Sequence, residues 1–138
     1  MTLLAATLPT PWAPLSIIVE TSDRPIVLAA AFSPLAELTA KAGLPTSELR
    51  QSKTLDGVAS VVTAYVDGQH DAFDTLVVRQ PGGPFMQDCW QALRRVPAGT
   101  VVSYAELASA AGRPAAVRAA GTACSSNLIA PIIPCHRV

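Results

Sequence analysis

The sequence predicts an α/β (α+β) fold, with strands and helices mixed in the first part of the chain and helices dominating the second. Short apolar segments rich in valine and isoleucine recur between polar turns before residue 80. The turn-forming cluster Gln80–Pro84 then interrupts this pattern. Amphipathic helical repeats with capping signals follow it. We therefore expect the 138-residue chain to form two lobes, over 1–80 and 85–138.

In the first lobe we expect a hairpin followed by helices. Apolar runs on either side of the polar segment Thr21–Pro25 indicate paired strands. Ser33 and Pro34 offer an N-cap and a first-turn proline for a helix that Gly43 ends. Residues 44–54 are expected to be irregular apart from one short helix. The predicted elements are strands over 15–20 and 26–32, helices over 34–42 and 56–66, and a strand over 73–78.

Composition narrows the class of protein and its compartment. Half of the residues are hydrophobic, yet no apolar run is long enough to span a bilayer. The opening segment Met1–Ala6 lacks the basic residues of a signal peptide. Three cysteines occur without a Cys-x-x-Cys pair, which disfavours a disulfide framework or a zinc cluster. We expect a cytoplasmic protein without membrane association.

The net charge is zero, but the charges divide unevenly along the chain. Residues 1–84 carry five basic and eight acidic side chains, a net charge of −3. Residues 85–138 carry five arginines against Asp88 and Glu106, a net charge of +3. This asymmetry suggests that the second lobe faces a polyanion. Such a modest charge implies few phosphate contacts and a salt-sensitive affinity.

The second lobe is expected to begin with two helices. An amphipathic pattern over 85–96 places Cys89 on the apolar side, where it would fill the core. Ser103 and Glu106 then form a Ser-x-x-Glu capping box for a helix that Gly112 ends.

A further helix from Pro114 to about Ser125 would complete a helix-turn-helix, a pair that also occurs in proteins that never bind DNA. Its side chains are small apart from Arg118. Specific readers of the major groove need several long polar side chains. This helix therefore favours binding that ignores base sequence, and an ordinary solvated arginine is the alternative for Arg118.

The last five residues, Pro134-Cys135-His136-Arg137-Val138, combine a thiol with two basic side chains. The thiolate is the nucleophilic form of cysteine, and neighbouring cations favour it. Adjacent side chains of an extended chain point to opposite faces. His136 would therefore need a bridging water or a turn to act as a base for Cys135. The alternative is a buried cysteine that ends a core strand.

This pentapeptide resembles the active-site signature of the O6-alkylguanine-DNA alkyltransferases, the methylated-DNA–protein-cysteine methyltransferases, and most closely the catalytic domain of bacterial members. The similarity covers roughly residues 85–138, and the first lobe resembles the family only loosely, through Thr10–Leu15. Further matching motifs are Phe85-x-x-x-x-Trp90, Pro97–Ala108, Arg113–Gly121 and Asn127, eight residues before Cys135.

The resemblance implies a single-use DNA-repair protein. Cys135 would take the alkyl group from O6 of guanine and keep it as a thioether. His136 would deprotonate Cys135 through a water, and Tyr104 would donate a proton to the departing guanine. Arg118 would enter the base stack in place of a flipped nucleotide.

The resemblance also implies the fold and the contacts of the site. The second lobe would be winged-helix-like and would bind the minor groove of double-stranded DNA, as a monomer, without a cofactor or metal. Asn127 would hold the helix pair against the active-site turn, and backbone carbonyls of Cys135 and Val138 would accept hydrogen bonds from the guanine amine. The DNA-binding set is Ser103, Tyr104, Ala116 and Arg118, and the substrate-binding or structural set is Asn127, Pro134, Arg137 and Val138.

The sequence ends at Val138, whereas family members continue past this motif through a Gly-rich loop, a glutamate that orients the histidine and a final helix. We therefore expect the second lobe to be incomplete at its C-terminus. This leaves open a sensor that binds alkylguanine without repairing it, or an inactive fragment. A cysteine hydrolase using Cys135 and His136 would also need an orienting residue and an oxyanion hole, and nothing in the sequence points to them.

Overall fold

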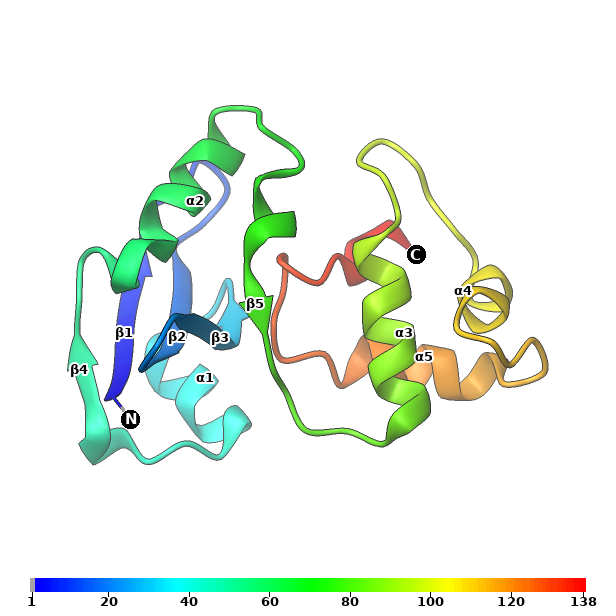
Figure 1. Ribbon diagram of the computed structural model, residues 1–138, viewed down its shortest axis with the longest axis horizontal. Coiled ribbons are helices and arrows are strands. Elements are labelled where there is room, and N and C mark those ends of the chain that lie inside the picture. Colours follow the sequence, from blue (N-terminus) through cyan, green and yellow to red (C-terminus); the bar gives the residue numbers. More distant parts are fainter. Residues whose placement is uncertain (1) are drawn as a thin grey trace. The chain divides into compact units, whose positions relative to one another are not determined.

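The computed structural model describes residues 2–138. The chain divides into two compact units, a first unit that ends at Gln80 and a second unit over Pro81–Val138 (Figure 1). The first unit contains a mixed sheet with helices, and the second unit is helical. This arrangement confirms the predicted α/β class.

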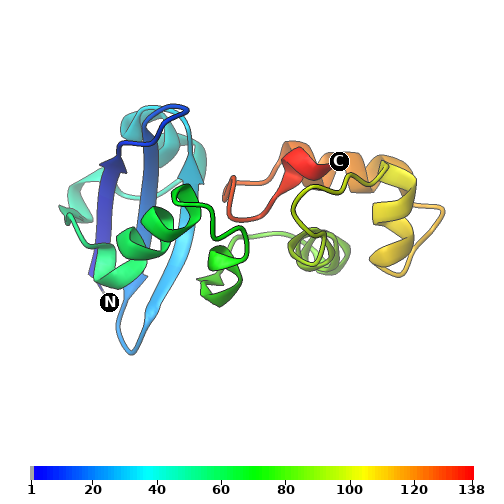
Figure 2. The same cartoon turned by 90° about the horizontal axis from the view of Figure 1, so that it is seen from above.

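The first unit is built on a five-stranded sheet in the order β4-β1-β2-β3-β5. Its three long strands pair antiparallel, and the short edge strands β4 and β5 pair parallel with β1 and β3. Figure 2 shows the two helices on opposite sides of this sheet. The elements are β1 (Thr2–Leu8), β2 (Leu15–Thr21), β3 (Pro25–Ala31), α1 (Leu35–Ala42), β4 (Leu49–Gln51), α2 (Val58–Val66) and β5 (Val77–Val78).

Helices on both sides of the sheet explain why β2 is buried along most of its length. On one face, Ile18 packs with Ala5, Ala29 and Leu38 of α1. Its neighbour Ile17 points to the other face and is also fully buried. The apolar run Ile17–Val19 at the centre of β2 is the pattern expected of a strand without a solvent face.

Several expectations for the first unit were wrong. Residues Thr2–Leu8 form β1, which the sequence pattern did not predict, and the segment 44–54 contains β4. Residues 72–75 form a 3-10 turn, so only Val77–Val78 remain of the strand expected over 73–78. Pro34 is the N-cap of α1 and no side chain caps this end. The missed strands are alanine-rich or very short, so they depend on tertiary pairing more than on their own propensity.

The second unit packs three helices against one another, α3 (Pro84–Arg94), α4 (Tyr104–Ala110) and α5 (Val117–Ser125). Trp90 of α3 is buried, and its indole Nε1 donates a hydrogen bond of 2.8 Å to the carbonyl of Ala123 on α5. Cys89 is fully buried, in agreement with its place on the apolar side of the helix.

The helix-turn-helix differs from the expected one at a single boundary. The Ser103–Glu106 capping box is present with both of its hydrogen bonds. Helix α5 begins at Val117, because Arg113 to Ala116 form a separate turn closed by a bond of 2.9 Å between the Ala116 amide and the Arg113 carbonyl. Pro114 therefore lies in this turn and is not the first residue of α5.

Two glycines of the second unit should respond to alanine in opposite directions. A Cβ on Gly82 would lie 2.7 Å from the buried ring of Trp90, whereas a Cβ on Gly121 meets no atom within 4 Å. We expect Gly82→Ala to destabilise the protein by about 1–3 kcal/mol through overpacking. Gly121→Ala should stabilise α5 by about 0.5–1 kcal/mol because alanine is the better helix former. Urea unfolding measures both, and equal effects would contradict the close approach of Gly82 to Trp90.

Candidate active site

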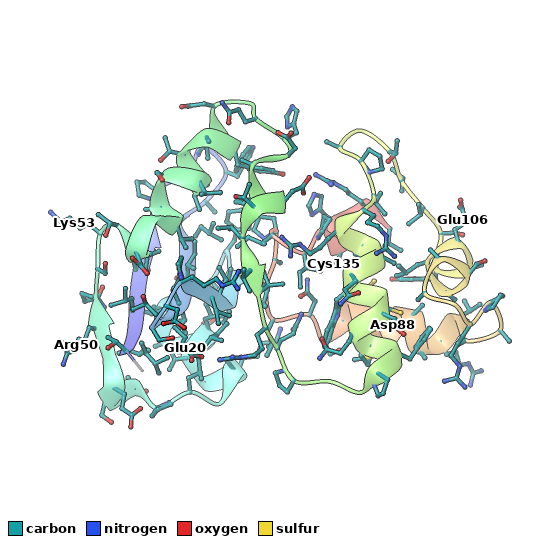
Figure 3. All side chains as sticks on the ribbon, in the orientation of Figure 1. Glu20, Arg50, Lys53, Asp88, Glu106 and Cys135 are labelled. Atoms are coloured by element: carbon teal, nitrogen blue, oxygen red, sulfur yellow. The ribbon has the colours of Figure 1, made fainter. Side chains whose placement is uncertain are left out.

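Cys135 lies at the end of a buried loop. The segment that follows α5 is apolar, and Ile129, Ile133 and Pro134 are buried. Cys135 then opens a 3-10 turn (Cys135–Arg137) and is only partly buried (Figure 3). The Cys135 amide donates to the Ile133 carbonyl at 2.9 Å, so its backbone position is fixed. The loop therefore brings one thiol from the core to the surface of the second unit.

Asn127 holds this loop in place. Its side chain is buried, and its Nδ2 donates to the Ile133 carbonyl at 3.0 Å. Its Oδ1 accepts a hydrogen bond of 3.0 Å from the Ile129 amide. The backbone amide of Asn127 donates to the Cys124 carbonyl at the end of α5, at 3.4 Å. Asn127 thus ties the end of α5, through its backbone, to the segment that leads into Cys135, through its side chain.

His136 follows Cys135 in the same turn and is exposed. Partial withdrawal of the ring from water lowers the pKa of His136, and the positive charge of Arg137 lowers it further. Most of the imidazole is therefore neutral near pH 7 and able to accept a proton. Within residues 2–138, the thiol of Cys135 and the imidazole are not joined by a hydrogen bond.

The guanidinium of Arg137 is partly buried and forms a hydrogen bond within the protein. Its Nη1 donates to the carbonyl of Val96, just past the end of α3, at 2.6 Å. Its own backbone carbonyl accepts a bond of 2.9 Å from the Val102 amide, just before α4. The sequence suggested Arg137 as a cation beside the thiol, and it gave no indication of these two contacts.

Tyr104 and Ser103 stand at the start of α4. Ser103 is the N-cap, and its hydroxyl accepts a bond of 3.0 Å from the Glu106 amide. Tyr104 is the first helical residue, and 47 % of its surface is exposed. An exposed phenol at a rigid helix start can donate a proton to a bound molecule.

Helix α5 presents a narrow polar surface. Arg118, Ala119 and Thr122 are exposed, whereas Ala120 and Ala123 are buried against the other helices. Ala116, the N-cap, and Gly121 are half-buried. Among these exposed residues of α5, Arg118 has the one long side chain. A partner could therefore approach the helix backbone closely around it.

The second unit contains two further thiols that are poor nucleophiles. Burial, together with smaller contributions from the charges of Cys135 and Cys89, raises the pKa of Cys124 to about 11. Burial also raises the pKa of Cys89, with a smaller contribution from Asp88. Both thiols therefore stay protonated near pH 7. The electrostatic coupling of Cys124 to Cys135 joins residues eleven positions apart, and no sequence motif indicated it.

Two negative findings concern the described part of the chain. Between residues 2 and 138, histidine, cysteine and acidic side chains form no group of three that could hold a metal ion. In the same range, no helix is long and apolar enough to cross a bilayer.

Comparison with known proteins agrees with this geometry. Residues 84–138 match the family model of the 6-O-methylguanine DNA methyltransferase DNA binding domain. The methylated-DNA–protein-cysteine methyltransferase of Methanosarcina barkeri is 36% identical over 126 residues, which cover 88% of this chain and 79% of that protein. The chain belongs to the methylated-DNA–protein-cysteine methyltransferase family. This finding confirms the resemblance seen in Pro134–Val138.

Further relatives and solved structures also match. The Salmonella typhimurium enzyme is 43% identical over 82 residues, and this chain spans 48% of its length. The crystal structure of Mycobacterium tuberculosis O6-methylguanine methyltransferase superposes with a TM-score of 0.73 and 25% identity, over 99% of this chain and 78% of the other. A crystal structure of Mycobacterium tuberculosis OGT in complex with DNA superposes with a TM-score of 0.70 and 26% identity, over 98% and 77%.

The lowered pKa of His136 can be measured directly. We expect the imidazole to titrate with a midpoint below its usual value of 6.5, because burial and Arg137 both disfavour the charged form. The measurement is an NMR titration of the ring protons, with His70→Gln to assign the two histidines. A midpoint at or above 6.5 would contradict the environment described for His136.

Proposed function

We propose that this protein repairs DNA by moving an alkyl group, such as a methyl group, from O6 of guanine to the sulfur of Cys135. The observation that carries this proposal is a partly exposed Cys135, held at the end of a buried loop in a chain of the methyltransferase family. The sulfur–carbon bond forms as the carbon–oxygen bond breaks, and guanine leaves. The thioether is stable, so each molecule acts once.

His136 would generate the attacking thiolate. It is neutral near pH 7 and lies in the same turn as Cys135, and a turn was one of the two alternatives, beside a bridging water, that the sequence left open. Since no hydrogen bond joins the described Cys135 and His136 side chains, the proton would pass from sulfur to imidazole through a water molecule. The raised pKa values of Cys124 and Cys89 leave Cys135 as the acceptor.

Tyr104 would assist the leaving group. Guanine departs with an extra electron pair, and a proton from the phenol neutralises it as the bond breaks. General acid help of this kind contributes ~10²–10⁴-fold to a rate. The exposed position of Tyr104 at the start of α4 suits this role. Backbone carbonyls of Cys135 and Val138 would accept hydrogen bonds from the guanine amine, with Pro134 stiffening the entry to the turn.

Double-stranded DNA would be the partner, bound through the helix-turn-helix by a monomer. The small surface of α5 supports close docking in the minor groove, where little base sequence can be read. Arg118 would fill the space left by the flipped nucleotide, with Ala116 and Ser103 beside it. The net charge of +3 over residues 85–138 and the DNA complex of the related OGT agree with this partner. A thiol that works only when reduced suits the cytoplasm.

Intact mass spectrometry tests the proposal. After incubation with a duplex that carries one O6-methylguanine, the protein should gain the mass of one methyl group in place of a hydrogen, located on the peptide that contains Cys135. Cys135→Ala should gain nothing and should still bind DNA, whereas Cys124→Ala, the matched control, should gain the same mass as the unchanged protein. Binding without a mass gain would indicate a sensor, and a methyl group on Cys124 or Cys89 would refute the assignment.

A further inference from the structure

Both ends of the loop between α3 and α4 are bonded to one residue, Arg137. The loop leaves α3 through Val96, whose carbonyl accepts the Arg137 guanidinium at 2.6 Å. It enters α4 after Val102, whose amide donates to the Arg137 carbonyl at 2.9 Å. Figures 1 and 2 both show this loop passing beside the C-terminal turn.

The loop depends on these bonds because it has little packing of its own. Its tip is a tight turn, in which the Thr100 hydroxyl donates to the Pro97 carbonyl at 2.7 Å and Gly99 has a positive φ of 83°. Val101 is 73% exposed, so it contributes almost no apolar burial. A loop with few buried contacts takes its position from the bonds at its ends.

Arg137 therefore stands between the two groups that the proposed transfer brings together. Cys135 lies two residues before it in the same 3-10 turn, which the bond from the Arg137 amide to the Pro134 carbonyl closes at 3.0 Å. Tyr104 lies two residues beyond Val102. The route from thiol to phenol through Arg137 needs only one hydrogen bond, from the Val102 amide to the Arg137 carbonyl.

On the basis of the proposed function, we propose that Arg137 is a positioning residue that sets the place of Tyr104 relative to the sulfur of Cys135. Its backbone carbonyl holds the exit of the loop, and its guanidinium holds the entrance. A guanidinium suits this task because it is always charged and its planar N–H groups make strong hydrogen bonds to a carbonyl. Its contribution acts through Tyr104, so Arg137 need not touch the DNA.

Two reactions of Cys135 separate this role from an effect on the thiol. Transfer from O6-methylguanine needs a proton for the departing base, whereas alkylation of Cys135 by iodoacetamide releases iodide and needs none. Arg137→Met removes the side-chain bond to the Val96 carbonyl at similar length and leaves the backbone bond to Val102 in place, and Arg137→Lys retains a side-chain donor. We expect Arg137→Met to slow transfer by on the order of 10²-fold, the typical cost of a misplaced catalytic group. Alkylation of Arg137→Met by iodoacetamide, followed on the Cys135 peptide, should slow far less than transfer does, because the turn remains and only the smaller effect of the Arg137 charge on the pKa of His136 is lost.

Three results would overturn the proposal. Arg137→Met could transfer as fast as the unchanged protein, or it could slow both reactions equally, which would place its effect on the thiol. In the double variant, the losses of transfer rate caused by Arg137→Met and Tyr104→Phe could also add in full. A residue that acts through Tyr104 should instead add little once the phenol is gone. Arg137→Lys should recover part of the rate and keeps the test open if Arg137→Met does not fold. If the unchanged protein transferred no methyl group to Cys135, the proposed function itself would be refuted.

Discussion

The candidate site of the second unit depends on the hydrogen bonds made by the buried side chain of Asn127. It bonds to the backbone of Ile129 and Ile133 and so shapes the loop that precedes Cys135. The 3-10 turn follows directly from this loop, and Arg137 at its end reaches Val96 and the backbone before α4. Loss of the Asn127 side chain would remove the partner of the Ile129 amide and leave the Ile133 carbonyl with the bond from the Cys135 amide, at a cost of about 1–3 kcal/mol. A polar residue in the core thus fixes the geometry at the surface.

Chemical selectivity follows from where each thiol lies. Burial and neighbouring thiols raise the pKa of Cys124 to about 11, and burial raises that of Cys89. Cys135 is partly buried and lies in the same turn as a histidine with a lowered pKa. The same loop therefore provides access for one sulfur and keeps the neutral imidazole close to it. This division of roles explains how a protein with three free cysteines would direct the proposed alkyl transfer to one of them.

Local sequence patterns predicted the local structures and left the long-range contacts unpredicted. The Ser103–Glu106 capping box and the amphipathic α3 are encoded within a few residues, and both were predicted. The strand β1 was missed although it pairs with the next strand of the chain, because its alanines have a low propensity for strands. Arg137 and Val96 are 41 residues apart, and no pattern links a guanidinium to a particular backbone carbonyl. The motif at Cys135 pointed to the chemistry, whereas the packing of the loop that holds it needed the structure.

Amide hydrogen exchange in the Asn127→Ala variant tests most directly whether this side chain holds the site. Exchange at Ile129 and Cys135 should accelerate by about 10–10²-fold relative to the unchanged protein, as expected for a loss of about 1–3 kcal/mol. The exchange rates of amides within α3 should change far less. Ser126→Ala, a change at an exposed neighbour, should leave the loop protected. If the loop exchanged at the same rate with and without the Asn127 side chain, the site would be held by something else.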